Sequence, residues 1–128
     1  MSLREQLRVM VVDDMATSRG LITEALAAFG IQHVRCANSG SAALADLATH
    51  PAHLIISDMN MPGMDGLQLL SALRKAPRTA KVGFLLITGR ASNDIVTEGR
   101  KLGMNNLVAK PFENKDLLRA VEAIVGRI

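Results

Sequence analysis

Five short apolar runs recur along this 128-residue chain, and each is followed by a segment whose apolar residues repeat at helical spacing. We predict that the runs are strands, at residues 8–12, 33–37, 53–57, 82–87 and 107–109. The helices are predicted at residues 15–29, 39–47, 67–76, 92–103 and 114–125. Strands that alternate with helices over short connections form parallel sheets, and continuously apolar strands are buried on both faces. The pattern therefore predicts an α/β fold, a doubly wound sheet of five parallel strands with five helices.

Polar caps and glycines mark the ends of several predicted helices. Ser39, Ser92 and Asn114 are suitable N-cap residues for the second, fourth and fifth helices. Gly30 and Gly103 supply stops for the first and the fourth.

A single domain is expected over residues 1–128. The chain is long enough to bury a core without disulfides, and no linker, repeat or low-complexity segment interrupts it. It ends where the last predicted helix ends, so we expect no second domain. Cys36 is the one cysteine and is predicted to be a small core residue.

The composition argues against nucleic acid and membranes as partners. The 15 basic residues are interleaved with 12 acidic ones, and the formal net charge is only +3. An aromatic content of 2% leaves little for stacking on bases or flavin. The apolar runs are also far shorter than a membrane span. We therefore expect a monomeric cytoplasmic protein.

Polar residues follow four of the five predicted strands. Asp13 and Asp14 follow the first, Asp58 the third, Thr88 the fourth and Lys110 the fifth. The carboxyl ends of parallel strands meet at one edge of the sheet, which is where ligands bind in open α/β folds. The sequence therefore predicts that three carboxylates, a hydroxyl and an ammonium converge there.

Such a group of carboxylates favours a bound cation. Two like charges 4 Å apart repel by roughly 4 kcal/mol at an intermediate dielectric constant. Oxygen ligands without nearby His or Cys favour Mg²⁺, which is commonly completed by a phosphate oxygen. Thr88 and Lys110 are suited to bind phosphoryl oxygens, and Asp58 is suited to accept a phosphoryl group as a nucleophile.

Nearly the whole chain resembles the receiver domains of response regulators. The motifs are Val11-Val12-Asp13-Asp14, Asp58-Met59-Asn60-Met61-Pro62-Gly63-Met64-Asp65-Gly66, Thr88-Gly89 and Lys110-Pro111-Phe112. The resemblance implies a flavodoxin-like sheet with strand order 2-1-3-4-5. Within the family, the chain looks most like the single-domain chemotaxis regulators of the CheY type.

The resemblance also implies roles for the residues at the strand ends. Asp58 would take a phosphoryl group from a phosphohistidine on a histidine kinase. Asp14, Asp58 and the backbone carbonyl of Asn60 would bind Mg²⁺, with Asp13 helping through water. 

Three further positions would modulate the site. The Lys110-Pro111 bond is expected to be cis. Leu107 stands where these regulators usually carry a Tyr or Phe that moves on activation. Arg90 is expected to overhang the site and to alter the rate at which water reaches the phosphoryl group.

Three functions stay open at this stage. The first is a binding module switched by phosphorylation, with a flagellar motor component as partner. The second, suggested by Leu107, is a phosphate sink that drains the kinase without binding a motor. The third is an aspartate-nucleophile phosphatase, but such enzymes usually carry an Asp where this chain has Asn60. We therefore expect a phosphoacceptor, not an enzyme, although it takes part in its own phosphorylation and dephosphorylation.

Overall fold

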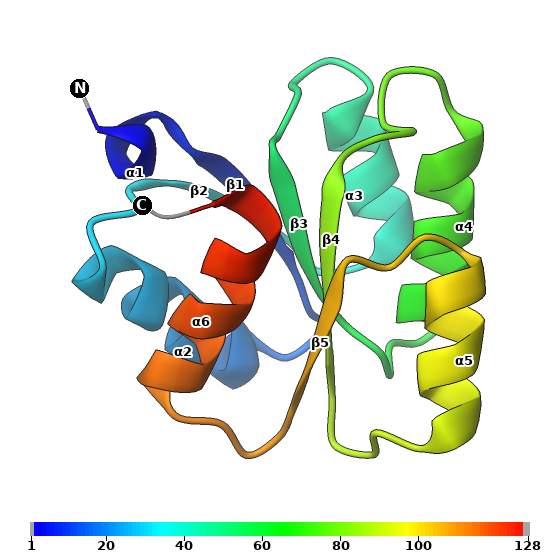
Figure 1. The fold of residues 1–128 in the computed structure, drawn as a ribbon. Helices are drawn as coiled ribbons and strands as arrows, with labels where there is room; N and C mark the ends of the chain where they lie inside the picture. Colours follow the sequence, from blue (N-terminus) through cyan, green and yellow to red (C-terminus); the bar gives the residue numbers. More distant parts are fainter. Residues whose placement is uncertain (1, 127–128) are drawn as a thin grey trace.

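The computed structural model describes residues 2–126, and its centre is a parallel sheet of five strands (Figure 1). The strands are β1 (Arg8–Val12), β2 (His33–Ala37), β3 (Leu54–Asp58), β4 (Gly83–Thr88) and β5 (Asn106–Ala109). Their order across the sheet is β2-β1-β3-β4-β5. The predicted α/β class, the five parallel strands and the strand order are all confirmed.

Helices cover both faces of the sheet (Figure 1). α2 (Ala16–Ala28) and α6 (Asn114–Val125) lie on one face, and α3 (Gly40–Leu47), α4 (Gly66–Lys75) and α5 (Asn93–Lys101) lie on the other. No helix within residues 2–126 is long and apolar enough to cross a membrane.

The prediction of five helices was wrong, because the structure has one further short helix. α1 (Leu3–Gln6) precedes β1, so residues 2–126 contain six helices. Its four residues are too few to show a helical repeat in the sequence. The local signal is instead the Ser2 hydroxyl, which accepts a hydrogen bond from the Glu5 N–H at 3.3 Å.

Each face of the sheet has its own apolar core, because successive residues of a strand point to opposite faces. In β1, Val9 and Val11 pack with side chains of α2 and α6. Met10 and Val12, which alternate with them, pack with side chains of α3 and α4. β3 and β4 are buried along their whole length, as their continuous apolar sequence predicts.

Two of the three predicted N-caps are confirmed. The hydroxyls of Ser39 and Ser92 accept hydrogen bonds from the N–H groups of Ala42 and Ile95. The prediction for the last helix was wrong, because Glu113 is the N-cap and Asn114 is the first helical residue. The Glu113 N–H donates to the Asp116 carboxylate at 3.0 Å, so the cap begins one residue earlier than expected.

Cys36 is exposed, so its assignment to the core was wrong. It lies in β2, which is an edge strand of the sheet. An edge strand has a neighbour on one side only, and the helices cover its faces less completely. The Cys36 Sγ lies 3.7 Å from the Thr23 Oγ1, on the side of α2.

We expect Gly66→Ala to lower the free energy of unfolding by about 1–3 kcal/mol. A Cβ at Gly66 would lie 2.6 Å from the Asp58 carbonyl oxygen and 2.7 Å from Leu86 Cδ1. The matched control is Gly20→Ala in α2, where a Cβ would meet nothing within 4 Å. That substitution should stabilise the chain by about 0.5–1 kcal/mol, because alanine loses less entropy in a helix.

Urea unfolding followed by far-UV circular dichroism measures both changes, since the chain has no Trp or Tyr for fluorescence. Equal stabilities for native protein and Gly66→Ala would show that α4 does not need this close approach to β3.

Candidate functional site

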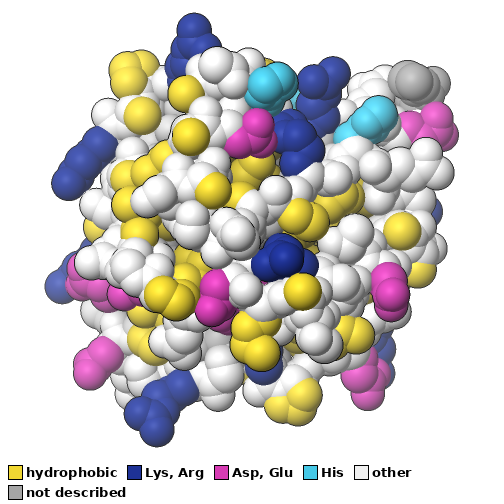
Figure 2. All heavy atoms as spheres, turned by 180° about the vertical axis from the view of Figure 1, so that it is seen from behind, with side chains coloured by type: hydrophobic (Ala, Val, Ile, Leu, Met, Phe, Trp, Pro, Cys, Tyr) yellow, Lys and Arg dark blue, Asp and Glu magenta, His cyan; other side chains and the backbone are white. Residues whose placement is uncertain are grey.

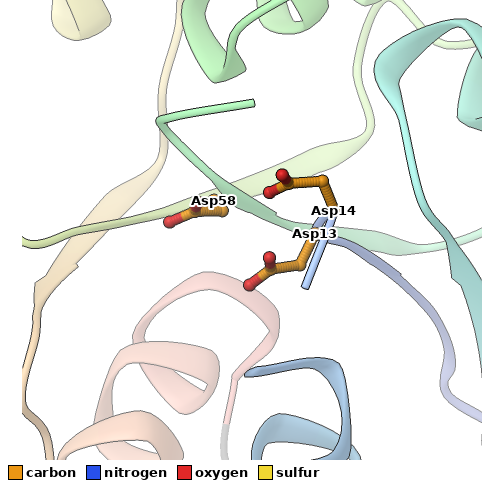
Figure 3. Close-up of side chains that lie close together, drawn as sticks. All are labelled: Asp13, Asp14 and Asp58. Atoms are coloured by element: carbon orange, nitrogen blue, oxygen red, sulfur yellow. The ribbon is translucent and has the colours of Figure 1, made fainter. Parts of the chain in front are cut away.

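Three carboxylates meet at the carboxyl ends of the adjacent strands β1 and β3 (Figure 3). Val12 pairs with Ser57, so Asp13 and Asp58 follow side by side, and Asp14 comes next along the chain. One carboxylate oxygen from each aspartate lies within 4.8 Å of the others. The predicted convergence of these three residues is confirmed.

Asp13 is the most deeply placed of the three. It is fully buried, whereas Asp58 is 8% exposed and Asp14 is exposed. The Asp13 Oδ1 accepts a hydrogen bond from the Met15 N–H at 2.9 Å. Its Oδ2 is buried and has no hydrogen-bond partner among residues 2–126. Burial raises the pKa of Asp13, and the negative charge of Asp58 raises it further.

This arrangement fits a hard divalent cation. A buried carboxylate oxygen without a donor costs free energy, and three carboxylates this close repel one another. A cation such as Mg²⁺ would satisfy both, because it prefers carboxylate and carbonyl oxygens. Asn60 is exposed in the loop after β3, beside Met61, which is buried and holds that loop on the core.

Lys110 reaches the same cluster from the far side of β4. Its Nζ lies 2.9 Å from the Asp58 Oδ1, as expected if the two act together. The Lys110 N–H donates to the Thr88 carbonyl at 2.8 Å, which fixes the chain just after β5. The Lys110-Pro111 peptide bond is cis, as predicted.

Thr88 ends β4 and is buried, but its hydroxyl is engaged elsewhere. It donates to the Arg90 carbonyl at 3.2 Å and accepts from the Arg90 N–H at 3.1 Å. Both bonds are local, since Arg90 is two residues further along the chain. By strand alternation, Thr88 belongs to the face of Phe84 and Leu86, on the side of α4. Asp58 shares its face with Ile56, on the side of α2 and α6.

Arg90 and Leu107, which we expect to modulate the site, belong to the segments at and just before this edge. Arg90 is exposed, and its backbone forms the turn that holds the Thr88 hydroxyl. Leu107 pairs with Leu86 in the sheet and packs, half-buried, against the core on the side of α4.

Sequence reasoning missed Arg19. Its guanidinium Nη1 donates to the Asp13 carbonyl at 2.8 Å, so a basic side chain of α2 contacts the backbone of the acidic cluster. Nothing in the spacing of Arg19 distinguishes it from other arginines. The contact depends on how α2 is placed against β1.

We expect Asp13→Asn to raise the free energy of unfolding in EDTA near neutral pH, by on the order of 1 kcal/mol. The substitution removes a buried charge. A raised pKa means that the folded chain binds the proton more tightly than the unfolded one, so native stability falls as pH rises through that pKa. The two proteins should therefore converge in acid.

Urea unfolding at neutral and acidic pH checks this prediction. If Asp13→Asn is the less stable protein in EDTA at neutral pH, the buried Asp13 carboxylate is not a source of instability.

Comparison with known proteins agrees with this geometry. Residues 9–122 match the model of the response regulator receiver domain. A probable chemotaxis protein CheY from Rhizobium etli is 38% identical over 128 residues, covering 100% of this chain and 99% of that protein. The chemotaxis protein CheY of Pseudomonas aeruginosa is 33% identical over 122 residues, covering 95% of this chain and 98% of that protein.

A solved structure shows the same fold. The chemotaxis protein CheY4 of Vibrio cholerae has a TM-score of 0.87 and 30% identity, covering 92% of this chain and 98% of that chain. The family model and the two relatives each match nearly the whole chain. The chain therefore belongs to the response regulator receiver domain family.

Proposed function

We propose that this protein is a stand-alone response regulator, with residues 1–128 as its single domain, which accepts a phosphoryl group on Asp58 from a histidine kinase. One observation carries the proposal: the Lys110 Nζ lies 2.9 Å from the Asp58 Oδ1, beside two further carboxylates. That arrangement joins a nucleophilic oxygen to a cation able to hold phosphoryl oxygens. The relatives at 38% and 33% identity are named as chemotaxis proteins, so we place this one in a chemotaxis pathway.

In the proposed transfer, an Asp58 carboxylate oxygen bonds to phosphorus while the bond from phosphorus to the imidazole nitrogen of the kinase breaks. The electron pair of that bond stays on the imidazole. Lys110 neutralises one phosphoryl oxygen. To donate to another, Thr88 must give up its hydrogen bond to the Arg90 carbonyl. The resulting change in the Thr88 turn would alter the surface formed by α5, β5 and α6. The affinity of that surface for a partner protein would then change.

Mg²⁺ is proposed to be held by the carboxylates of Asp14 and Asp58 and by the Asn60 backbone carbonyl, with Asp13 acting through water. When bound, it would supply positive charge that offsets the carboxylates and the phosphoryl oxygens. The buried Asp13 Oδ2 supports this, because among residues 2–126 it has no hydrogen-bond partner.

The surface beside Lys110 favours a protein as phosphodonor. A cavity of about 400 Å³ lies between α2 and the segment after β5, lined by Lys110 and by Leu21, Ile22 and Phe112 among others. Leu21 is 61% exposed, which is high for a leucine. An apolar surface next to the phosphoacceptor suits a partner that buries it on docking.

Nucleic acid is not among the proposed partners. On the face shown in Figure 2, most basic side chains stand apart, and they do not form one continuous patch. Residence in the cytoplasm and a monomeric state remain predictions from the sequence.

The phosphate sink is the second candidate, and Leu107 is the observation that favours it. An aliphatic side chain packed at this position cannot provide the moving aromatic ring of the usual switch. Binding of the phosphorylated chain to a flagellar motor switch protein separates the two functions, since the sink does not require it. The phosphatase is disfavoured, because the Asn60 amide is too weak an acid to protonate a leaving group as a carboxylic acid does.

We expect the native chain to gain the mass of one phosphoryl group on incubation with Mg²⁺ and acetyl phosphate. Asp58→Asn should gain none, because its amide is not a nucleophile for phosphorus. EDTA should suppress the gain in the native chain. Intact-protein mass spectrometry measures all three, and an unmodified native chain would refute the proposed function.

We expect Arg90→Ala to increase the dephosphorylation rate of the phosphorylated chain severalfold. Arg90 is exposed next to the Thr88 turn, so truncating it would open the approach of water to phosphorus. Arg78→Ala, which removes an arginine of the connection after α4, is the control. The loss of phosphoryl mass over time gives the rates, and an unchanged rate for Arg90→Ala would show that its side chain does not shield the site.

A further inference from the structure

Asp13 is held at two points, by the N-cap residue of α2 and by a side chain within α2. Its carboxylate Oδ1 accepts from the Met15 N–H at 2.9 Å, and its backbone carbonyl accepts from Arg19 Nη1 at 2.8 Å. We propose that Arg19 is a positioning residue, which fixes the Asp13–Asp14 turn and thereby sets the affinity of the acidic cluster for Mg²⁺. The inference rests on the metal site of the proposed function and assigns a role to a residue outside that site.

The carbonyl that Arg19 binds belongs to the peptide unit between Asp13 and Asp14. The preceding unit is already fixed, because the Asp13 N–H donates to the Ala37 carbonyl of β2 at 3.1 Å. Arg19 therefore holds the next peptide plane, where the chain leaves the sheet. Rotation of that plane would swing the Asp14 carboxylate, which is exposed and lacks the packing that holds Asp13.

The bond from Arg19 is well suited to this task. Hydrogen bonds from a charged guanidinium are stronger than those between neutral groups, and this one is partly buried. Arg19 is itself anchored in α2, since its N–H donates to the Met15 carbonyl at 3.0 Å and its carbonyl accepts from the Thr23 hydroxyl at 2.7 Å. The Asp13–Asp14 turn and Arg19, which binds it, thus form one rigid unit.

Groups that orient metal ligands without touching the metal commonly change metal affinity when they are removed. The typical loss is about 10- to 100-fold. Arg19 binds a backbone carbonyl and not a ligand side chain, so we expect a loss of about 10-fold, at the lower end of that range.

The test compares Arg19→Met with the native chain. Methionine keeps most of the apolar stem and removes the guanidinium, and Arg19→Lys keeps the charge. Arg78→Met is the matched control, because Arg78 Nη1 also donates to a backbone carbonyl, that of Ala48 at 2.7 Å, in another part of the fold. Mg²⁺ titrations followed by backbone amide NMR give dissociation constants without any phosphodonor, and urea unfolding gives the stability of each protein.

We expect Arg19→Met to weaken Mg²⁺ binding about 10-fold, with partial recovery in Arg19→Lys and no change in Arg78→Met. If Arg19, like Arg78, only stabilises the fold, both methionine variants would change in stability and neither would change in Mg²⁺ affinity. Unchanged affinity in Arg19→Met, or equal loss in Arg78→Met, would overturn this inference alone. Failure of the native chain to bind Mg²⁺ would overturn the proposed metal site as well.

Discussion

Electrostatic repulsion among Asp13, Asp14 and Asp58 is the constraint on which this site depends. One carboxylate oxygen of each lies within 4.8 Å of the others, and two like charges about 4 Å apart repel by roughly 4 kcal/mol at an intermediate dielectric constant. Lys110 offsets part of this through Asp58, and burial of Asp13 adds to the cost of ionisation. In the proposed function, a bound cation would offset the remaining negative charge before Asp58 accepts a phosphoryl group.

The sheet holds the charges together against this repulsion. β1 and β3 are adjacent and buried, so their ends cannot move apart without opening both apolar cores. Gly66 lets α4 begin against the backbone that follows Asp58, and the Gly66 N–H donates to the Met59 carbonyl at 2.9 Å. Packing and backbone hydrogen bonds thus provide the stability that the acidic cluster lacks.

The features that the sequence predicts correctly are those that depend on runs of neighbouring residues. Continuous apolar runs identified buried parallel strands, and the position of Asp58 at the end of such a run placed it at the ligand-binding edge. The exposure of Cys36 could not be predicted locally, because it depends on β2 being an edge strand. The partners of Thr88 and Arg19 depend in the same way on tertiary placement. The Thr88 hydroxyl bonds the Arg90 backbone, and Arg19 reaches the Asp13 carbonyl from α2, which packs against β1.

The central claim is that Asp58, the carboxylate beside Lys110, takes the phosphoryl group in preference to its two acidic neighbours. Borohydride reduction of the phosphorylated chain converts an aspartyl phosphate to homoserine, which peptide mass spectrometry can locate. Trypsin separates the candidates, since Asp13 and Asp14 fall in peptide 9–19 and Asp58 in peptide 36–74. The account predicts homoserine at position 58 alone. Homoserine at position 13 or 14 would contradict it.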